Sequence, residues 1–137
     1  MDTAGIQRAL VAEYSETIRE TLRCADAVSE AWPDESVRDR EHLVEPFRAL
    51  LTDRGVLSTY PAMLATAVEA GGETMQAQPV AAPPYVVVTS TGPLLRATLP
   101  AGRLVIRIEA FDVVGSGPPT YRRAKSSPDA ALSVDYR

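Results

Sequence analysis

The sequence predicts an α+β fold, in which an N-terminal layer of about three helices packs on a C-terminal antiparallel sheet, a meander. Apolar side chains recur at spacings of three and four through residues 4–70, whereas residues 83–114 alternate between apolar and polar around two glycine-containing turns. Helices followed by strands favour two segregated layers over alternating strand–helix units. At this length we expect one domain, residues 1–137, with a helical part (1–72) and a sheet part (73–137).

The first predicted helix spans residues 4–32 and ends before Pro33, which disfavours a helical conformation in the preceding residue. Charged side chains lie between the apolar positions, and two pairs at i,i+3, Glu16 with Arg19 and Glu20 with Arg23, attract each other. We interpret these charges as a solvated surface. The apolar stripe consists of Ile6, Leu10, Tyr14, Ile18, Leu22, Ala25, Val28 and Trp32.

Two shorter helices are predicted over residues 35–54 and 60–70, each followed by glycine. Pro46 lies inside the first of them and lacks the amide that would bond to the carbonyl of His42. We therefore expect a kink, or a new helix start, and a free His42 carbonyl. Alternation over residues 73–78 predicts a short strand at a sheet edge.

The register of the meander follows from its turns. With Thr91-Gly92 and Ala101-Gly102 as two-residue hairpin turns, Arg96 lies directly opposite Arg107. Like charges in that position destabilise a sheet unless something neutralises them. The same turns give one apolar face toward the helices: Val86, Val88, Leu95, Ala97, Leu99, Leu104, Ile106 and Ile108.

The second face of the meander is mixed, and it is where we expect function. Glu109 is diagonal to Arg96, so an internal network of Arg96, Arg107 and Glu109 is one interpretation. The alternatives are an anionic ligand or an acidic partner surface, such as the helices of another copy. The large apolar residues on this face also need cover: Val87, Leu94, Val105, Phe111 and Val113.

Beyond the meander we expect a loop over residues 115–119, a strand over 120–124, a turn over 126–130 and a closing strand over 132–136. Arg122, Arg123 and Lys125 are the one cluster of basic residues. They are interpreted as a solvated strand or, alternatively, as a site for nucleic acid or another anion.

No residue set in the sequence predicts a catalytic or metal site. His42 is the single histidine and Cys24 the single cysteine, so a four-ligand zinc site is not supported. We interpret His42 as a surface residue and Cys24 as a half-buried small side chain. The chain is accordingly expected to be neither an enzyme nor a cofactor carrier.

Composition adds a charge asymmetry. Residues 1–78 carry 14 acids and 7 Arg, a net charge of −7, whereas residues 79–137 carry 4 acids, 6 Arg and 1 Lys, a net charge of +3. Apolar residues make up 45% and charged residues 23%, as in ordinary globular proteins. One cysteine, no long apolar run and an N-terminus unlike a signal peptide favour a cytoplasmic, non-membrane protein.

The segment VAAPPYVVVTSTGP, residues 80–93, and the arginine-rich acidic composition resemble those of small uncharacterised proteins from salt-loving archaea. The resemblance implies a domain of unknown function and carries over no activity and no site residue. The sequence thus favours a non-catalytic protein-interaction or oligomerisation module. The alternative is a nucleic-acid-binding or anion-binding accessory protein that uses the basic C-terminal half.

Overall fold

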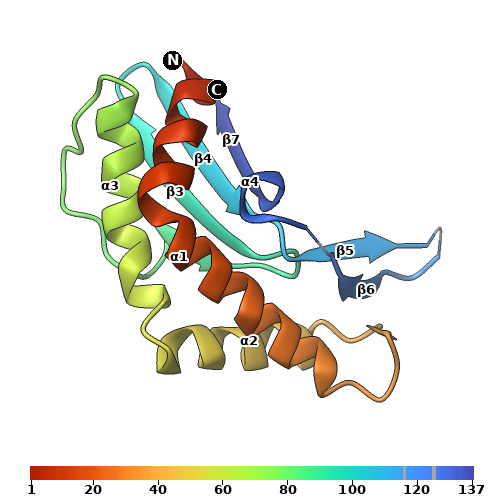
Figure 1. The fold of residues 1–137 in the computed structure, drawn as a ribbon. Coiled ribbons are helices and arrows are strands. Elements are labelled where there is room, and N and C mark those ends of the chain that lie inside the picture. The colour runs from red at the N-terminus through yellow and green to blue at the C-terminus, as the bar shows by residue number, and fades with distance from the viewer. Residues whose placement is uncertain (116, 125) are drawn as a thin grey trace.

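A computed structural model describes residues 1–115, 117–124 and 126–137 of the chain. Helices precede antiparallel strands, which confirms the α+β prediction (Figure 1). The 3-10 helix η1 leads directly into α3. In chain order the elements are α1 (Thr3–Glu30), β1 (Ser36–Val37), α2 (Glu41–Asp53), η1 (Leu57–Thr59), α3 (Tyr60–Ala70), β2 (Val86–Val88), β3 (Pro93–Leu99), β4 (Gly102–Ile108), β5 (Phe111–Val114), β6 (Thr120–Arg123), α4 (Pro128–Ala131) and β7 (Leu132–Tyr136).

The predicted three-stranded meander is present as β2-β3-β4, but the described strands form two antiparallel sheets rather than one. The larger has the order β2-β3-β4-β7 and the smaller the order β1-β6-β5. The chain leaves the larger sheet after β4, where the amides of Ala110 and Phe111 both donate to the carbonyl of Thr91, at 2.8 and 3.0 Å. Strands β5 and β6 then pair with each other and project from the body as a hairpin (Figure 1).

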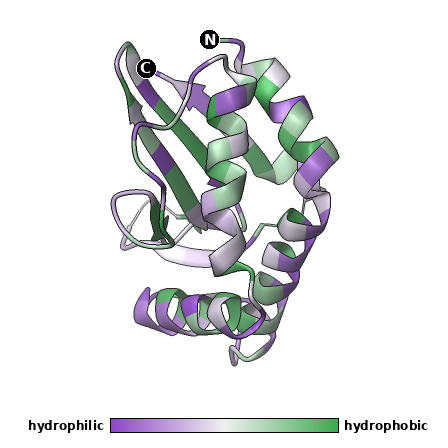
Figure 2. Cartoon of the chain, turned by 90° about the vertical axis from the view of Figure 1, so that its left-hand side faces the viewer, coloured by the Kyte–Doolittle hydropathy of each residue, from purple (hydrophilic) through white to green (hydrophobic). Residues whose placement is uncertain are grey.

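Helices α1 and α3 cover one face of the larger sheet, here called the inner face, by packing against β7 and β3 respectively. Figure 2 shows these helices on one side of the sheet and no described helix on the other. The eight residues predicted to face the helices are all buried, at 5% exposure or less. That face was therefore predicted correctly.

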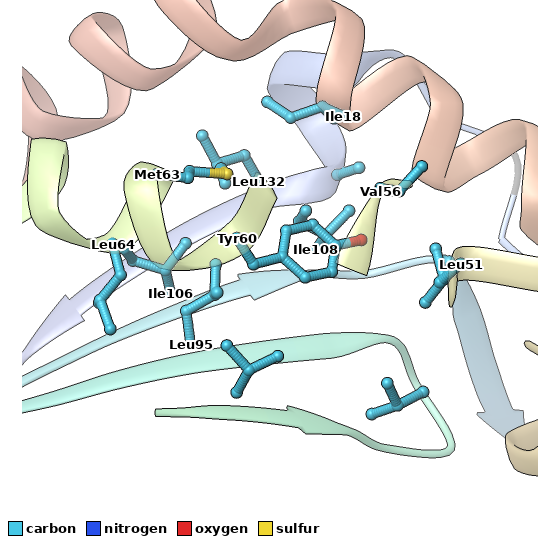
Figure 3. Packing of buried hydrophobic residues seen from close by; sticks show 14 of the residues in the cluster. Ile18, Leu51, Val56, Tyr60, Met63, Leu64, Leu95, Ile106, Ile108 and Leu132 are labelled. Atoms are coloured by element: carbon cyan, nitrogen blue, oxygen red, sulfur yellow. The ribbon is translucent and has the colours of Figure 1, made fainter. Parts of the chain in front are cut away.

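Tyr60 lies at the centre of the core, between α1 and the sheet. Figure 3 shows it projecting from α3 near Ile108, with Met63 and Leu64 on the same helix. Its hydroxyl lies 2.6 Å from the Thr21 hydroxyl of α1, and burial raises the pKa of Tyr60 well above the usual tyrosine range. The hydrogen bond links two helices within an otherwise apolar core.

Both predicted hairpin turns are displaced by one position toward the N-terminus. The turns are Ser90-Thr91 and Pro100-Ala101, because Thr89 pairs with Gly92 and Leu99 with Gly102. Both glycines are needed for close approach instead. A Cβ on Gly92, which has φ +146°, would lie 1.9 Å from the Ile108 carbonyl oxygen, and one on Gly102 would lie 2.5 Å from the Arg137 carbonyl oxygen.

The helices follow the predictions with local corrections. Helix α1 contains the predicted stripe up to Val28 and both i,i+3 ion pairs, Glu16–Arg19 at 2.9 Å and Glu20–Arg23 at 2.7 Å. It ends at Glu30, so Trp32, the last residue of the stripe, lies beyond it. It has a non-helical conformation at Tyr14, so two helical segments meet there.

Helix α2 starts at Glu41 and not at residue 35, because Ser36 and Val37 form β1 and pair with β6. Pro46 neither breaks this helix nor starts a new one. The His42 carbonyl, freed by Pro46, accepts a hydrogen bond from the Trp32 indole at 3.2 Å. A carbonyl predicted to lack its helical partner has thus found a tertiary one.

Three details between α3 and the C-terminus also differ from the predictions. Residues 73–78 form no strand, residues 128–131 form one helical turn rather than a loop turn, and β6 ends at Arg123. The predicted 115–119 loop includes position 116, which lies outside the described residues.

Candidate functional site: an arginine face on the open side of the sheet

The displaced turns change which arginines are neighbours. Arg96 lies opposite Val105 and Arg107 opposite Leu94, so Arg96 and Arg107 are diagonal and the predicted direct pairing is wrong. A directly opposed pair does exist, but it is Arg103 with Arg137. Each donates its amide to the other's carbonyl, at 2.7 and 3.0 Å. This pair extends the β4–β7 ladder by one position.

These side chains share the face of the larger sheet that no described helix covers, here called the outer face, because successive residues of a strand point to opposite faces. They line a shallow hollow with a volume of about 580 Å³. We define the arginine face as Arg96, Arg103, Arg107 and Arg137, the four cations that line this hollow.

One arginine of the four has an ionic partner. Arg107 lies 3.1 Å from Asp135 on β7, with side-chain exposures of 35% and 46%. The predicted partner Glu109 is exposed beyond the end of β4, so the predicted Arg–Glu network is wrong. Within residues 1–115, 117–124 and 126–137, no carboxylate pairs with Arg96, Arg103 or Arg137. The side chains of Arg96, Arg103 and Arg137 therefore have no ion-pair partner among the described residues.

The floor of the hollow is apolar. Val105 is 8% exposed although it points away from the helices, and it lies in register between Arg96 and Asp135. Long arginine stems cover apolar surface while their guanidinium groups stay in water, which accounts for this burial. Leu94, which also lines the hollow, is half-buried, and so is Val87, which pairs with Leu94 from β2.

The other two apolar residues predicted for this face belong to β5. Phe111 is 1% exposed and packs against Trp32 and Phe47, with ring centroids 5.8 and 5.3 Å away. Val113 is 52% exposed on the projecting hairpin. The outer face of the larger sheet is therefore less apolar and more cationic than the sequence predicted.

The second predicted basic cluster does not form a continuous surface. The Arg123 side chain is 7% exposed and donates to Asp26 at 2.9 Å and to the carbonyls of Ala110, Ala124 and Leu22. Arg123 therefore joins α1 to the β5–β6 hairpin.

Its neighbours do not extend the arginine face in the described chain. Arg122 is exposed but lines a different hollow, of about 840 Å³, beside Glu30, Asp34, Glu35 and Asp112. Lys125 lies outside the described residues.

His42 and Cys24, the single histidine and the single cysteine, are not placed for catalysis or metal binding. His42 is exposed on α2, and Cys24 is completely buried rather than half-buried. Burial raises the pKa of the Cys24 thiol, which lowers the fraction of reactive thiolate. The described residues contain no group of three or more His, Cys, Asp or Glu side chains placed to share a metal ion.

A family model described as a domain of unknown function (DUF7988) matches residues 4–137. The chain belongs to the DUF7988 family. No curated protein and no solved structure matches it. No helix in the described part of this DUF7988 chain is long and apolar enough to cross a membrane.

The sequence pattern predicts only two of the four residues of the arginine face. The predicted register makes Arg96 and Arg107 direct neighbours, whereas nothing in that register points to Arg103 or Arg137. A signal for Arg103 was present, since it has the same alternation parity as Arg107. Arg137 required knowledge that the closing strand pairs with β4, which the meander pattern does not supply.

Proposed function

We propose that this DUF7988 chain is a non-catalytic protein-interaction module that binds an acidic partner on the arginine face. The observation that carries the proposal is the opposed pair Arg103–Arg137, which has no carboxylate partner in the described chain. Directly opposed like charges destabilise a sheet by about 0.2–1 kcal/mol, and an external carboxylate removes that repulsion.

The chemistry of the hollow supports binding rather than catalysis. A guanidinium group stays protonated at physiological pH and offers several N–H donors in a planar fork, so it recognises carboxylates but does not exchange protons. The other lining residues are apolar apart from backbone groups and the Thr98 hydroxyl. This set provides orientation and charge without a nucleophile poised beside a base.

The layout of the face fits a short stretch of acidic polypeptide. The arginines lie in three rows that run across the strands: Arg103 with Arg137, then Arg96, then Arg107. Adjacent rows are two residues apart along a strand, which is a distance of about 7 Å. Neighbouring strands are about 4.8 Å apart, so the positive area spans roughly 14 by 10 Å. Leu94 and Val105 offer apolar contact beneath the charges.

Nucleic acid is the alternative partner, since phosphates also pair with arginine. No aromatic side chain lines the hollow, whereas binding of single strands commonly relies on bases stacked on aromatic rings. Arg122 and Arg123 add little, because one lines a hollow rich in acids and the other is buried. These features favour an acidic protein over nucleic acid.

The test compares a fluorescent Glu-rich peptide with a single-stranded oligonucleotide by anisotropy, using the wild type and a face variant. We expect Arg96→Gln, Arg103→Gln and Arg137→Gln together to weaken peptide binding about tenfold or more. A control with the same net charge carries Arg8→Gln, Arg19→Gln and Arg48→Gln, all on exposed helix positions. Equal losses in the two variants, or tighter binding of the oligonucleotide than of the peptide, would count against the proposal.

A further inference from the structure

The chain itself carries a negatively charged surface, opposite in sign to the arginine face. We define the acidic segment as residues 30–45, which contain 6 acids and 2 Arg, a net charge of −4. All six carboxylates are on exposed residues: Glu30, Asp34, Glu35, Asp39, Glu41 and Glu45. Only Glu45 among them has an ion-pair partner in the described chain, Arg48 at 3.6 Å.

The acidic segment cannot neutralise the arginine face of its own molecule. Arg103 is the second residue of β4 and Arg137 directly follows β7, so both lie at the end of the molecule where the β3–β4 turn and the C-terminus lie (Figure 1). The acidic segment, which joins α1 to α2, lies at the opposite end in both Figures 1 and 2. The arginine face and the acidic segment, which carry opposite charges, thus lie at opposite ends of the molecule.

A symmetric dimer formed by two arginine faces is also disfavoured. A two-fold contact would bring eight guanidinium groups together with two Asp135 carboxylates, and like charges facing each other cost several kcal/mol. Contact between the unlike ends of two copies brings opposite charges together instead.

We infer that the acidic partner of the arginine face is the acidic segment of a second copy of this chain, bound head to tail. This inference rests on the proposed function and names its partner. Because such a contact leaves one arginine face and one acidic segment unoccupied, association continues into chains or closes into a ring rather than stopping at a symmetric dimer.

The first measurement is the mass of the wild type in sedimentation velocity, over a range of concentrations. At an ionic strength of about 0.01 M, where charges interact over roughly 30 Å, we expect the mass to rise with concentration beyond that of a dimer. At about 1 M, where that length is roughly 3 Å, we expect the rise to shrink. A wild type that stays monomeric at low ionic strength overturns the inference.

The decisive experiment mixes two variants, each with three charges removed from one of the two surfaces. The first carries Glu30→Gln, Asp34→Asn and Glu35→Gln, and the second carries Arg96→Gln, Arg103→Gln and Arg137→Gln. We expect each alone to be monomeric where the wild type associates, and an equimolar mixture to form a 1:1 heterodimer and nothing larger. Assembly of either variant alone to the wild-type mass would contradict head-to-tail contact.

The failure of this inference is distinguishable from failure of the proposed function. If the wild type is monomeric but the Glu-rich peptide binds its arginine face, the partner is another acidic protein and the interaction module stands. If neither the peptide nor a second copy binds, both proposals fall. Circular dichroism of every variant checks that the exchanged surface residues leave the fold intact.

Discussion

The two faces of the larger sheet are made from alternate residues of the same strands, but different forces determine them. Leu104, Ile106 and Ile108 are completely buried against the helices, whereas Arg103 and Arg107, which alternate with them, line an open hollow. Burial of a large apolar side chain contributes about 1.5–3 kcal/mol, while an exposed ion pair contributes about 0–1 kcal/mol. The inner face therefore specifies the fold, and the charges of the outer face are not required for it.

The largest expected difference between the faces comes from adjacent residues of β4. Ile106→Ala on the inner face should lower the free energy of unfolding by about 2–5 kcal/mol, because it leaves a cavity beneath the helices. Val105→Ala on the outer face should cost about 1 kcal/mol, because flexible arginine stems can close over the smaller side chain. Urea denaturation measures both, and equal losses would show that the outer face is packed as a second core.

The next effect concerns the polar pair within the covered side. Tyr60→Phe should cost about 0.5–1.5 kcal/mol at neutral pH, because it removes the hydrogen bond to Thr21. The cost stays moderate since the Thr21 hydroxyl also donates to the Thr17 carbonyl at 2.8 Å.

This pair also gives a dependence on pH with a definite sign. Burial raises the pKa of Tyr60 in the folded chain, whereas an unfolded tyrosine titrates near pH 10. Above about pH 10 the unfolded chain binds fewer protons than the folded chain, so the wild type loses at most about 1.4 kcal/mol per pH unit through this group. The Phe variant lacks this loss, and the stability gap between the two proteins should narrow above pH 10. A gap that is constant from pH 7 to pH 11 would exclude this account.

The contrast between the faces also explains what could be predicted from sequence. A slip of two residues in a hairpin leaves every side chain on the same face, so the apolar face was correct although both turns were misplaced. The same slip does change which residues lie opposite each other on neighbouring strands. The opposed arginines were therefore predicted as Arg96 with Arg107, when they are Arg103 with Arg137.

The cause of the error was the ambiguity of glycine. Glycine marks a tight turn, but it also marks a place where another backbone passes closely, and sequence alone does not separate these uses. Gly92 and Gly102 serve the second purpose, toward the carbonyls of Ile108 and Arg137. Both contacts join segments remote in sequence, as does the pairing of β1 with β6 that shortened the predicted second helix.

On the outer face, the one ion pair of the arginine face should have a small effect on stability and a larger one on binding. Asp135→Asn removes the partner of Arg107 and should cost about 0.2–1 kcal/mol, because both side chains are partly exposed. The same change adds one uncompensated positive charge to the hollow and should strengthen binding of an acidic peptide.

Glu109→Gln is the matched control for this change. Glu109 is the first residue after β4. It is exposed and has no ion pair in the described chain. Its change should leave stability within about 0.5 kcal/mol of the wild type. Weaker peptide binding by the Asp135 variant would contradict the expected gain and would mean that the ion pair to Asp135 holds Arg107 in its binding position.

The smallest expected effect has the opposite sign and tests the opposed pair directly. Arg103→Gln removes one of two like charges at directly paired positions of β4 and β7, so it should raise the free energy of unfolding by a few tenths of a kcal/mol. Arg96→Gln is the control, because Arg96 lies opposite Val105 and loses no such repulsion. The gain should be larger at low salt, where repulsion between exposed charges is screened least. If Arg103→Gln instead destabilises the chain as much at high salt as at low salt, its stem matters to the sheet more than its charge does, and the opposed arginines would no longer indicate a missing anion.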